Sequence, residues 1–347
     1  MTRRRLVQVG SLVLGLILAT ACLGTAAAGE AGKTLSIMSN GGYYLETLQK
    51  YVIQPFEKKY GVKVLVTESF SVGMLNRLRA EKQNPSVDLV SIGEIAAVAG
   101  RPEGLFDKMD AAKIPNLANV AKHLRNKDGY GVQSVVSPIV IVYNKEKVKT
   151  PPAAWADFWN PEYKGKVVIA DIDNTMGPMF LVTAARMNGG NESNIDPGFQ
   201  KMLQLKPNLS YIYKGEGQEV PQGVAQGDIW VSHMMLVKAQ ELVKGGAKVG
   251  IVIPKEGAHP LPYTLEIVKG AKNLDLANKF VDMALSPEAQ LGFAKDLYVT
   301  PANLKVVLPD DLKGVLPTAD RLMDLDWVAI AKNRSAWTDR WNREITR

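Results

Sequence analysis

The sequence predicts an α/β protein built as two lobes, with mixed, mostly parallel sheets flanked by helices and a hinge of strands that cross between the lobes. Three observations predict this fold class. Near the N-terminus, short β-branched runs alternate with amphipathic helical segments, an order typical of parallel sheets covered by helices. The apolar run 132–143 is long enough to leave one lobe and enter the other. A chain of 347 residues also exceeds what one hydrophobic core usually organises.

The first lobe is predicted to begin with three strands separated by two helices. We expect the strands at 34–39, 62–67 and 87–92, and the helices at 43–60 and 72–83. In the first helix Leu45, Leu48, Val52 and Phe56 recur near one stripe, and Gly61 stands where a helix ends. Ligands of such sheets bind beyond the carboxyl ends of the strands.

The second lobe is predicted to span 140–263, so that the first lobe comprises 29–139 and 264–347 with the C-terminal helices. Its expected strands are 167–170, 228–232 and 248–254, its helices are 177–187, 199–205, 220–226 and 235–245, and the chain returns at 263–268. Ser286 as cap and Pro287 in the first turn predict the start of a later helix. In 325–345, Trp327, Trp337 and Trp341 recur at helical intervals, which indicates a packing helix.

The N-terminus reads as an export signal. Three arginines at positions 3–5 precede an apolar stretch at 12–18, and three alanines at 26–28 offer a cleavage site, so 1–28 is predicted to be a secretory signal peptide. The alternative is a lipoprotein signal that ends at Cys22, the only cysteine. Cleavage after residue 28 removes three arginines and no acidic residue, so the net charge falls from +7 to +4. The remaining basic residues are dispersed, which argues against a nucleic-acid surface.

The first candidate binding turn follows the first strand. It contains Asn40, Gly41, Gly42, Tyr43 and Tyr44. Glycines allow close approach of the backbone to a ligand, and the free N–H groups of the following helix favour a carboxylate or phosphonate. Either tyrosine could stack on a bound molecule. The alternative is a tight turn with one tyrosine in the core.

The second candidate turn, 171–177, precedes the first helix of the second lobe. Thr175 and Gly177 could offer a hydroxyl and an amide, whereas Asp171 and Asp173 could pair with a cation. The alternative is helix capping by Asn174 or Thr175 with solvated aspartates. A calcium loop is not expected, because the glycine and glutamate that such a loop requires are missing.

Other candidates for ligand contact lie at strand ends or on the crossing strands. They are Glu68, Glu94, Ser137, Tyr213, Trp230, His233 and Tyr263. The alternative for each is core packing or a solvated rim. His123 and His259 are expected in surface loops.

The crossing region 129–171, the N-terminal signal and the terminal stretch 325–345 together resemble the solute-binding proteins of bacterial ABC importers, in the branch that includes polyamine and ferric-iron binders. The resemblance implies a type II-like periplasmic-binding-protein fold and a periplasmic monomer that captures a small solute between its lobes. It also implies delivery to a permease, with ATPase subunits on other chains. No enzymatic turnover and no cofactor are implied.

The same resemblance bears on the ligand. Trp230 matches one aromatic of the polyamine-binding set, but Tyr263 stands where that set has an acidic residue, and the acidic residue expected soon after Asp171 is absent. Where ferric binders have adjacent tyrosines, this chain has Met234 and Met235, which do not suit a hard ferric ion. We therefore expect an organic solute with an anionic group, with polyamine or ferric-iron binding as alternatives.

An enzyme on a two-lobed fold, such as a hydrolase, is the alternative from a different class. The chain has no GxSxG, HExxH or GxxxxGK[ST] motif.

Overall fold

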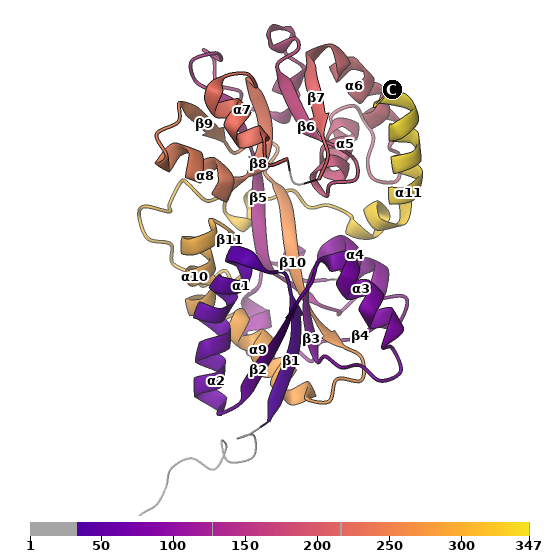
Figure 1. The fold of residues 1–347 in the computed structure, drawn as a ribbon, viewed down its shortest axis with the longest axis vertical. Coiled ribbons are helices and arrows are strands. Elements are labelled where there is room, and N and C mark those ends of the chain that lie inside the picture. Colours follow the sequence, from indigo (N-terminus) through magenta and orange to yellow (C-terminus); the bar gives the residue numbers. More distant parts are fainter. Residues whose placement is uncertain (1–32, 127, 216, 347) are drawn as a thin grey trace, which may run out of the picture.

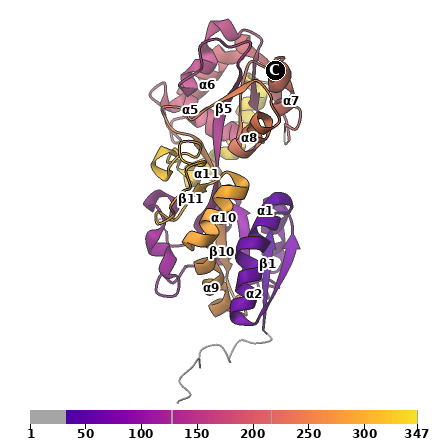
Figure 2. The ribbon, with the colours of Figure 1, turned by 90° about the vertical axis from the view of Figure 1, so that its left-hand side faces the viewer.

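The computed structural model describes residues 33–126, 128–215 and 217–346, so the predicted signal segment and Cys22 lie outside the described residues. Figure 1 shows two lobes joined by the long strands β5 (Val132–Asn144) and β10 (His259–Val268). Figure 2, turned by 90°, shows the same separation, with α5 (Met176–Arg186) in one lobe and α2 (Gln54–Tyr60) in the other. The two-lobed α/β prediction is therefore confirmed.

The first lobe contains a sheet in the order β2-β1-β3-β10. Strands β1 (Thr34–Ser39), β2 (Lys63–Glu68) and β3 (Leu89–Gly93) are parallel, whereas β10 is antiparallel to β3. The first helical segment comprises α1 (Gly42–Leu48), a π-helical turn (Gln49–Ile53) and α2, and it ends at Gly61, whose φ of 65° only glycine adopts readily. The lobe also contains α3 (Ser71–Ala80), α4 (Glu94–Gly100), β4 (Phe106–Asp107), and 3₁₀ turns at Pro115–Asn119 and Lys122–Leu124.

The second lobe repeats this layering. Strands β6 (Val167–Ala170), β7 (Leu209–Tyr213) and β8 (Val231–Met235) are parallel, and β8 and β9 (Val249–Val252) both pair with β5. Its helices are α5, α6 (Asp196–Leu205), α7 (Val220–Gln226) and α8 (Leu236–Lys244), with 3₁₀ turns at Trp155–Trp159, Pro161–Tyr163 and Lys206–Asn208. Strand β8 begins three residues later than expected.

The two crossing strands belong to both lobes. They pair antiparallel from His259 opposite Ile139 to Leu265 opposite Val132, and every residue of β5 is buried. One sheet therefore continues through the junction in the order β2-β1-β3-β10-β5-β8-β6-β7. The expected lobe boundaries at 139–140 and 263–264 fall inside these shared strands, because the apolar side chains of β5 pack in a core that extends into both lobes.

The chain after β10 forms α9 (Leu274–Ala284) and α10 (Pro287–Leu297), then β11 (Thr300–Pro301), a 3₁₀ turn (Ala319–Arg321) and α11 (Trp327–Glu344). The predicted start of α10 is confirmed, because the Ser286 hydroxyl accepts a hydrogen bond from Ala289 N at 3.2 Å. None of the helices in the described ranges is both long enough and apolar enough to span a membrane.

The assignment of the whole chain after 264 to the first lobe needs correction for α11. This helix lies along the second lobe in Figure 1, where Arg340 pairs with Asp196 of α6. The N-terminal part of α11 packs against α4 of the first lobe. The physical reason is local pairing, because Ala258 exchanges backbone hydrogen bonds with Arg321 and Met323 and draws the chain back to the second lobe.

The expectation that His259 lies in a surface loop is wrong. Its side chain is fully buried, and its ring stacks on Trp155 with 4.0 Å between centroids. Its Nε2 lies 2.7 Å from the Thr183 hydroxyl. Burial holds the pKa of His259 well below its usual value, so the ring stays neutral in the core.

Candidate functional site

A cavity of about 660 Å³ lies between the lobes at the carboxyl ends of β1 and β3. Across from these strand ends, the turn that precedes α5 and the N-terminal half of α11 complete its wall. Five of the predicted residues line it: Asn40, Glu94, Asp173, Thr175 and Tyr263. The cavity therefore combines both candidate turns, as expected for parallel sheets that bind ligands beyond their strand ends.

The first candidate turn contributes Asn40 to the cavity wall, and the side chains of Asn40 and Tyr44 contact Tyr263. The Asn40 side-chain amide donates to the Tyr263 hydroxyl at 3.1 Å, whereas Asn40 Oδ1 is buried with no hydrogen-bond partner among the described residues. Tyr44 packs against Tyr263 with 4.9 Å between ring centroids, and its hydroxyl lies 2.6 Å from Ser91 Oγ. Burial raises the pKa of Tyr44, which is the core tyrosine of the alternative interpretation.

The remaining residues of the first turn lie at the edge of the cavity. Tyr43 is 68% exposed, and Lys238 of α8 lies 5.8 Å from its ring centroid. A side chain at Gly41 would collide with the carboxylate of Glu68, which is exposed at the end of β2. Gly42 adopts a φ of 63°, which permits the sharp entry into α1. These glycines and Glu68 therefore shape the turn and do not line the cavity.

Some residues of the second candidate turn maintain the conformation of the turn, and others line the cavity. Asn174 accepts from Met176 N at 2.9 Å and donates to Gly215 O at 2.7 Å, so it holds the turn in place. A side chain at Gly177 would collide with the backbone carbonyl of Asp171. Asp173 and Thr175 line the cavity beside these two structural residues.

Arg334 of α11 lines the same cavity, and the sequence analysis missed it. Its guanidinium donates to the backbone carbonyl of Asp173 at 2.7 Å, and it forms no ion pair with any described carboxylate. Burial lowers the pKa of Arg334 from its usual value, although an arginine remains charged. The helical pattern assigned this residue to the polar face of α11 but carried no signal of what lies opposite that face.

Trp327 and Ala331, also on α11, line the cavity, and Phe70 and Val72 at the start of α3 are exposed at its edge. The interpretation of the terminal helix as packing alone is therefore incomplete. Trp337 and Trp341 do pack in the core, as expected.

Glu94 closes the floor of the cavity as part of a buried charge cluster. Arg101 donates to Glu94 Oε1 at 3.0 Å and to Glu266 Oε1 at 2.6 Å, and Thr264 donates to Glu94. Burial raises the pKa of Glu94 and raises that of Glu266 to about 8. Two carboxyl groups that share one guanidinium in a dry site favour retention of one proton.

Four further candidates do not line this cavity. His233 is fully buried, accepts from Ala170 N at 3.0 Å and lies 5.3 Å from the Phe180 ring, and burial lowers its pKa to about 3. The Tyr213 hydroxyl contacts Met176 Sδ at 3.9 Å in the core. Trp230 packs against the same core, and Ser137 lies buried opposite Leu261 on β10. Their predicted positions, at strand ends or, for Ser137, on a crossing strand, did not reveal that neighbouring elements cover them.

A two-lobed α/β fold with a polar cavity between lobes that share crossing strands defines a solute-binding protein. The chain belongs to the family of bacterial extracellular solute-binding proteins, whose model matches residues 51–319. It is accordingly the solute-binding component of an ABC importer.

Named relatives span most of the chain. The gamma-aminobutyric acid-binding protein of Pseudomonas aeruginosa is 28% identical over 308 residues, which cover 85% of this chain and 84% of that protein. The spermidine/putrescine-binding periplasmic protein of Escherichia coli is 25% identical and covers 93% and 92%. The crystal structure of an ABC transporter from Clostridium perfringens matches with a TM-score of 0.82 and 28% identity, over 90% of this chain and 99% of that one.

Proposed function

We propose that this protein captures a small organic solute with an anionic group in the cavity between its lobes. Lobe closure around the solute would then present the complex to a membrane permease, whose ATPase subunits lie on other chains. The observation that carries the ligand assignment is the guanidinium of Arg334, which faces the cavity without a described carboxylate partner.

The chemistry of Arg334 favours a carboxylate, phosphonate or phosphate. Arg334 is partly desolvated and forms no ion pair, because the Asp173 carboxylate acts on it only from farther away, so a bound anion would add the direct interaction that is missing. The planar guanidinium binds such anions through two parallel hydrogen bonds, and the Thr175 hydroxyl on the same wall can donate a third. The anionic end of the solute is therefore assigned to the α11 side of the cavity.

The other end of the solute meets a hydrogen-bond acceptor from the first lobe. Asn40 Oδ1 is buried with no described donor, and it can accept from an ammonium group. A short amino acid with separated charges fits both ends. The name of the Pseudomonas aeruginosa relative supports gamma-aminobutyric acid as the first compound to test.

Polyamine binding is the second candidate. The name of the Escherichia coli relative supports it, and Asp173 could hold an ammonium group. Arg334 opposes it, because a cationic ligand would meet an uncompensated guanidinium in the same cavity.

The proposal also covers removal of the signal peptide, the oligomeric state of the mature chain and the absence of chemical turnover. We propose that 1–28 is removed as a signal peptide, that the mature chain is a periplasmic monomer, and that it binds its solute without chemical turnover. Attachment to lipid through Cys22 is the alternative. The N-terminal mass of the exported protein distinguishes these routes, and recovery of the unchanged solute from the complex tests for turnover.

The ligand assignment is tested by calorimetry and thermal shift on the mature protein with gamma-aminobutyric acid, simple carboxylates, phosphonates and putrescine. Arg334→Gln should weaken binding of the anionic solute at least tenfold, which is about 1.4 kcal/mol. Arg343→Gln is the matched control, because Arg343 lies on the same helix but is exposed and outside the cavity. Binding of putrescine alone, strengthened by Arg334→Gln, would refute the anionic assignment in favour of a polyamine.

A further inference from the structure

The cavity between the lobes, which we now call the first cavity, has an apolar edge that a ligand with only polar contacts would leave in water. Phe70 and Val72, at the start of α3, line this edge and are 80% and 70% exposed. Large apolar side chains that gather at the edge of a cavity mark a surface that becomes buried on binding. A short amino acid held only by Arg334 and Asn40 would not cover them.

The backbone on both sides of Phe70 is held in place. Ser69 N donates to Ser39 O at 3.0 Å, so the residue before Phe70 is bound to the end of β1. The Ser71 hydroxyl accepts from Gly93 N at 3.0 Å, so the residue after Phe70 is bound to the end of β3. The exposed ring therefore projects from a fixed position beside the ends of two strands.

Across the first cavity, the lining residues of α11 follow one stripe of the helix. Trp327, Ala331 and Arg334 are separated by four and three residues, the spacing that places side chains on the same face. Arg334 lies at the end of the stripe that contacts Asp173, and Trp327 lies at the end where α11 packs against α4. A solute whose anionic group is bound by Arg334 therefore has an apolar surface beside it along the same helix.

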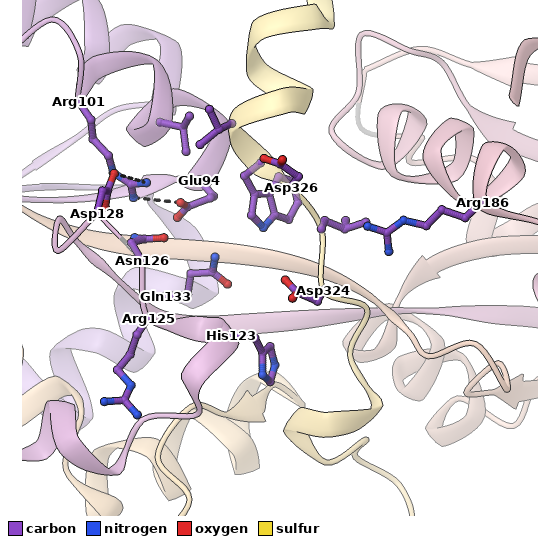
Figure 3. A pocket seen from close by; sticks show the side chains of 14 residues that line it. Glu94, Arg101, His123, Arg125, Asn126, Asp128, Gln133, Arg186, Asp324 and Asp326 are labelled. Carbon is purple, nitrogen blue, oxygen red and sulfur yellow. Dashed lines mark hydrogen bonds and ion pairs between the residues drawn. The ribbon is translucent and has the colours of Figure 1, made fainter. Parts of the chain in front are cut away.

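The part of α4 that lines the first cavity is apolar as well. Ile95, Ala96 and Ala99 line it, and the short alanine side chains leave space for a substituent of the solute. Glu94 precedes them on the same helix and is shared with an adjoining cavity of about 460 Å³, which Figure 3 shows together with the ion pair between Glu94 and Arg101. The carboxyl group of Glu94 is thus engaged within the protein, and the apolar side chains of α4 remain for the solute.

We propose that the solute of the first cavity carries an apolar substituent, an aryl or branched alkyl group, between its anionic and ammonium ends, and that Phe70 and Val72 determine this specificity. The inference rests on the proposed function, because the anionic group bound at Arg334 fixes where the substituent lies. The substituent packs between the start of α3 and the stripe of Trp327 and Ala331. Lobe closure then removes both the substituent and the Phe70 ring from water, and the gain in affinity grows with the apolar area that is buried.

The test compares two compounds that carry the same charged groups and differ only in one phenyl ring. They are gamma-aminobutyric acid and 4-amino-3-phenylbutanoic acid, measured by calorimetry on the mature protein. We expect the phenyl compound to bind at least tenfold tighter, because burial of the ring adds to the same polar contacts. Phe70→Ala should reduce this preference at least fivefold, whereas Phe70→Leu, which keeps an apolar side chain, should retain most of it.

A second pair of variants controls for the loss of an exposed apolar side chain. Val72→Ala should reduce the preference for the phenyl compound, by a smaller factor than Phe70→Ala. Val307→Ala is the matched control, because Val307 is 80% exposed and lies outside the first cavity, and it should leave both affinities unchanged. Arg334→Gln should weaken both compounds by the same factor, since they carry the same carboxylate.

Equal affinity for the two compounds, with both weakened by Arg334→Gln, would overturn the apolar specificity and leave the anionic assignment of the proposed function intact. A preference for the phenyl compound that persists in Phe70→Ala and Val72→Ala would place the ring elsewhere and overturn the inference as well. Absence of binding of both compounds at millimolar concentration would also overturn it. The proposed function falls with it only if the simple carboxylates and phosphonates fail to bind too.

Discussion

Removal of the titratable carboxyl group of Glu266 should make the stability of the protein less dependent on pH. Burial raises the pKa of Glu266 to about 8 from the usual value of 4.5 for a glutamate, and Arg101 offsets only part of that effect. Between pH 4.5 and 8 the folded state therefore holds a proton that the unfolded chain releases. Stability must fall as pH rises through this range, because the unfolded state binds fewer protons.

The size of the effect follows from the two pKa values. At 1.36 kcal/mol per unit, the raised pKa of Glu266 corresponds to at most about 5 kcal/mol of stability lost between pH 4.5 and 8. Glu266→Gln keeps an oxygen that accepts from Arg101 but has no proton to lose. We expect this variant to lose most of the decline in stability between pH 5 and pH 8, and to gain on the wild type as pH rises.

Urea unfolding of the mature protein at pH 5, 6.5 and 8 measures this effect. Glu288→Gln is the control, because Glu288 is exposed on α10. If Glu266→Gln and the wild type lose the same free energy of unfolding from pH 5 to pH 8, then Glu266 does not retain its proton, and the reasoning about the buried cluster is wrong.

Two further predictions concern packing and the first cavity. Phe280→Ala should lower the free energy of unfolding by about 3–5 kcal/mol, because this ring is fully buried and packs 5.3 Å from the ring of Phe56. Urea titration measures the loss, and a change below about 1 kcal/mol would contradict the packing. Tyr263→Ala should weaken solute binding about tenfold, whereas Tyr43→Ala at the exposed edge should have a smaller effect; calorimetry with the identified solute compares them, and the reverse order would contradict the position of the site.

The sequence predicted the local elements well because their signals are local. The strand at 34–39, the strand at 167–170 and the helix at 220–226 have the bounds that were expected. Strand β8 was misplaced because the apolar residues that precede it, Ile229 and Trp230, also pack in the core although they lie outside the strand. An apolar side chain indicates burial but does not specify the backbone conformation in which it is buried.

The candidate site was predicted only in part. Asn40, Thr175 and Tyr263 were found because strand ends and crossing strands face the space between lobes in this fold class. His233 occupies a similar strand end but lies in the core, since Trp155 and Phe180 cover it. Periodicity identifies the end of a strand and contains no information about the elements that pack over it.

Composition and hydrophobic pattern were sufficient for the class of protein, the alternation of strands and helices, and the two crossings, because each of these depends on neighbours along the chain. The position of α11 depended on contacts with distant segments. Arg334 meets Asp173 across 161 residues of sequence, and Arg340 meets Asp196 across 144. Only the folded chain places a cation from the last helix in the first cavity, because a helical pattern defines a polar face but not the surface that this face will meet.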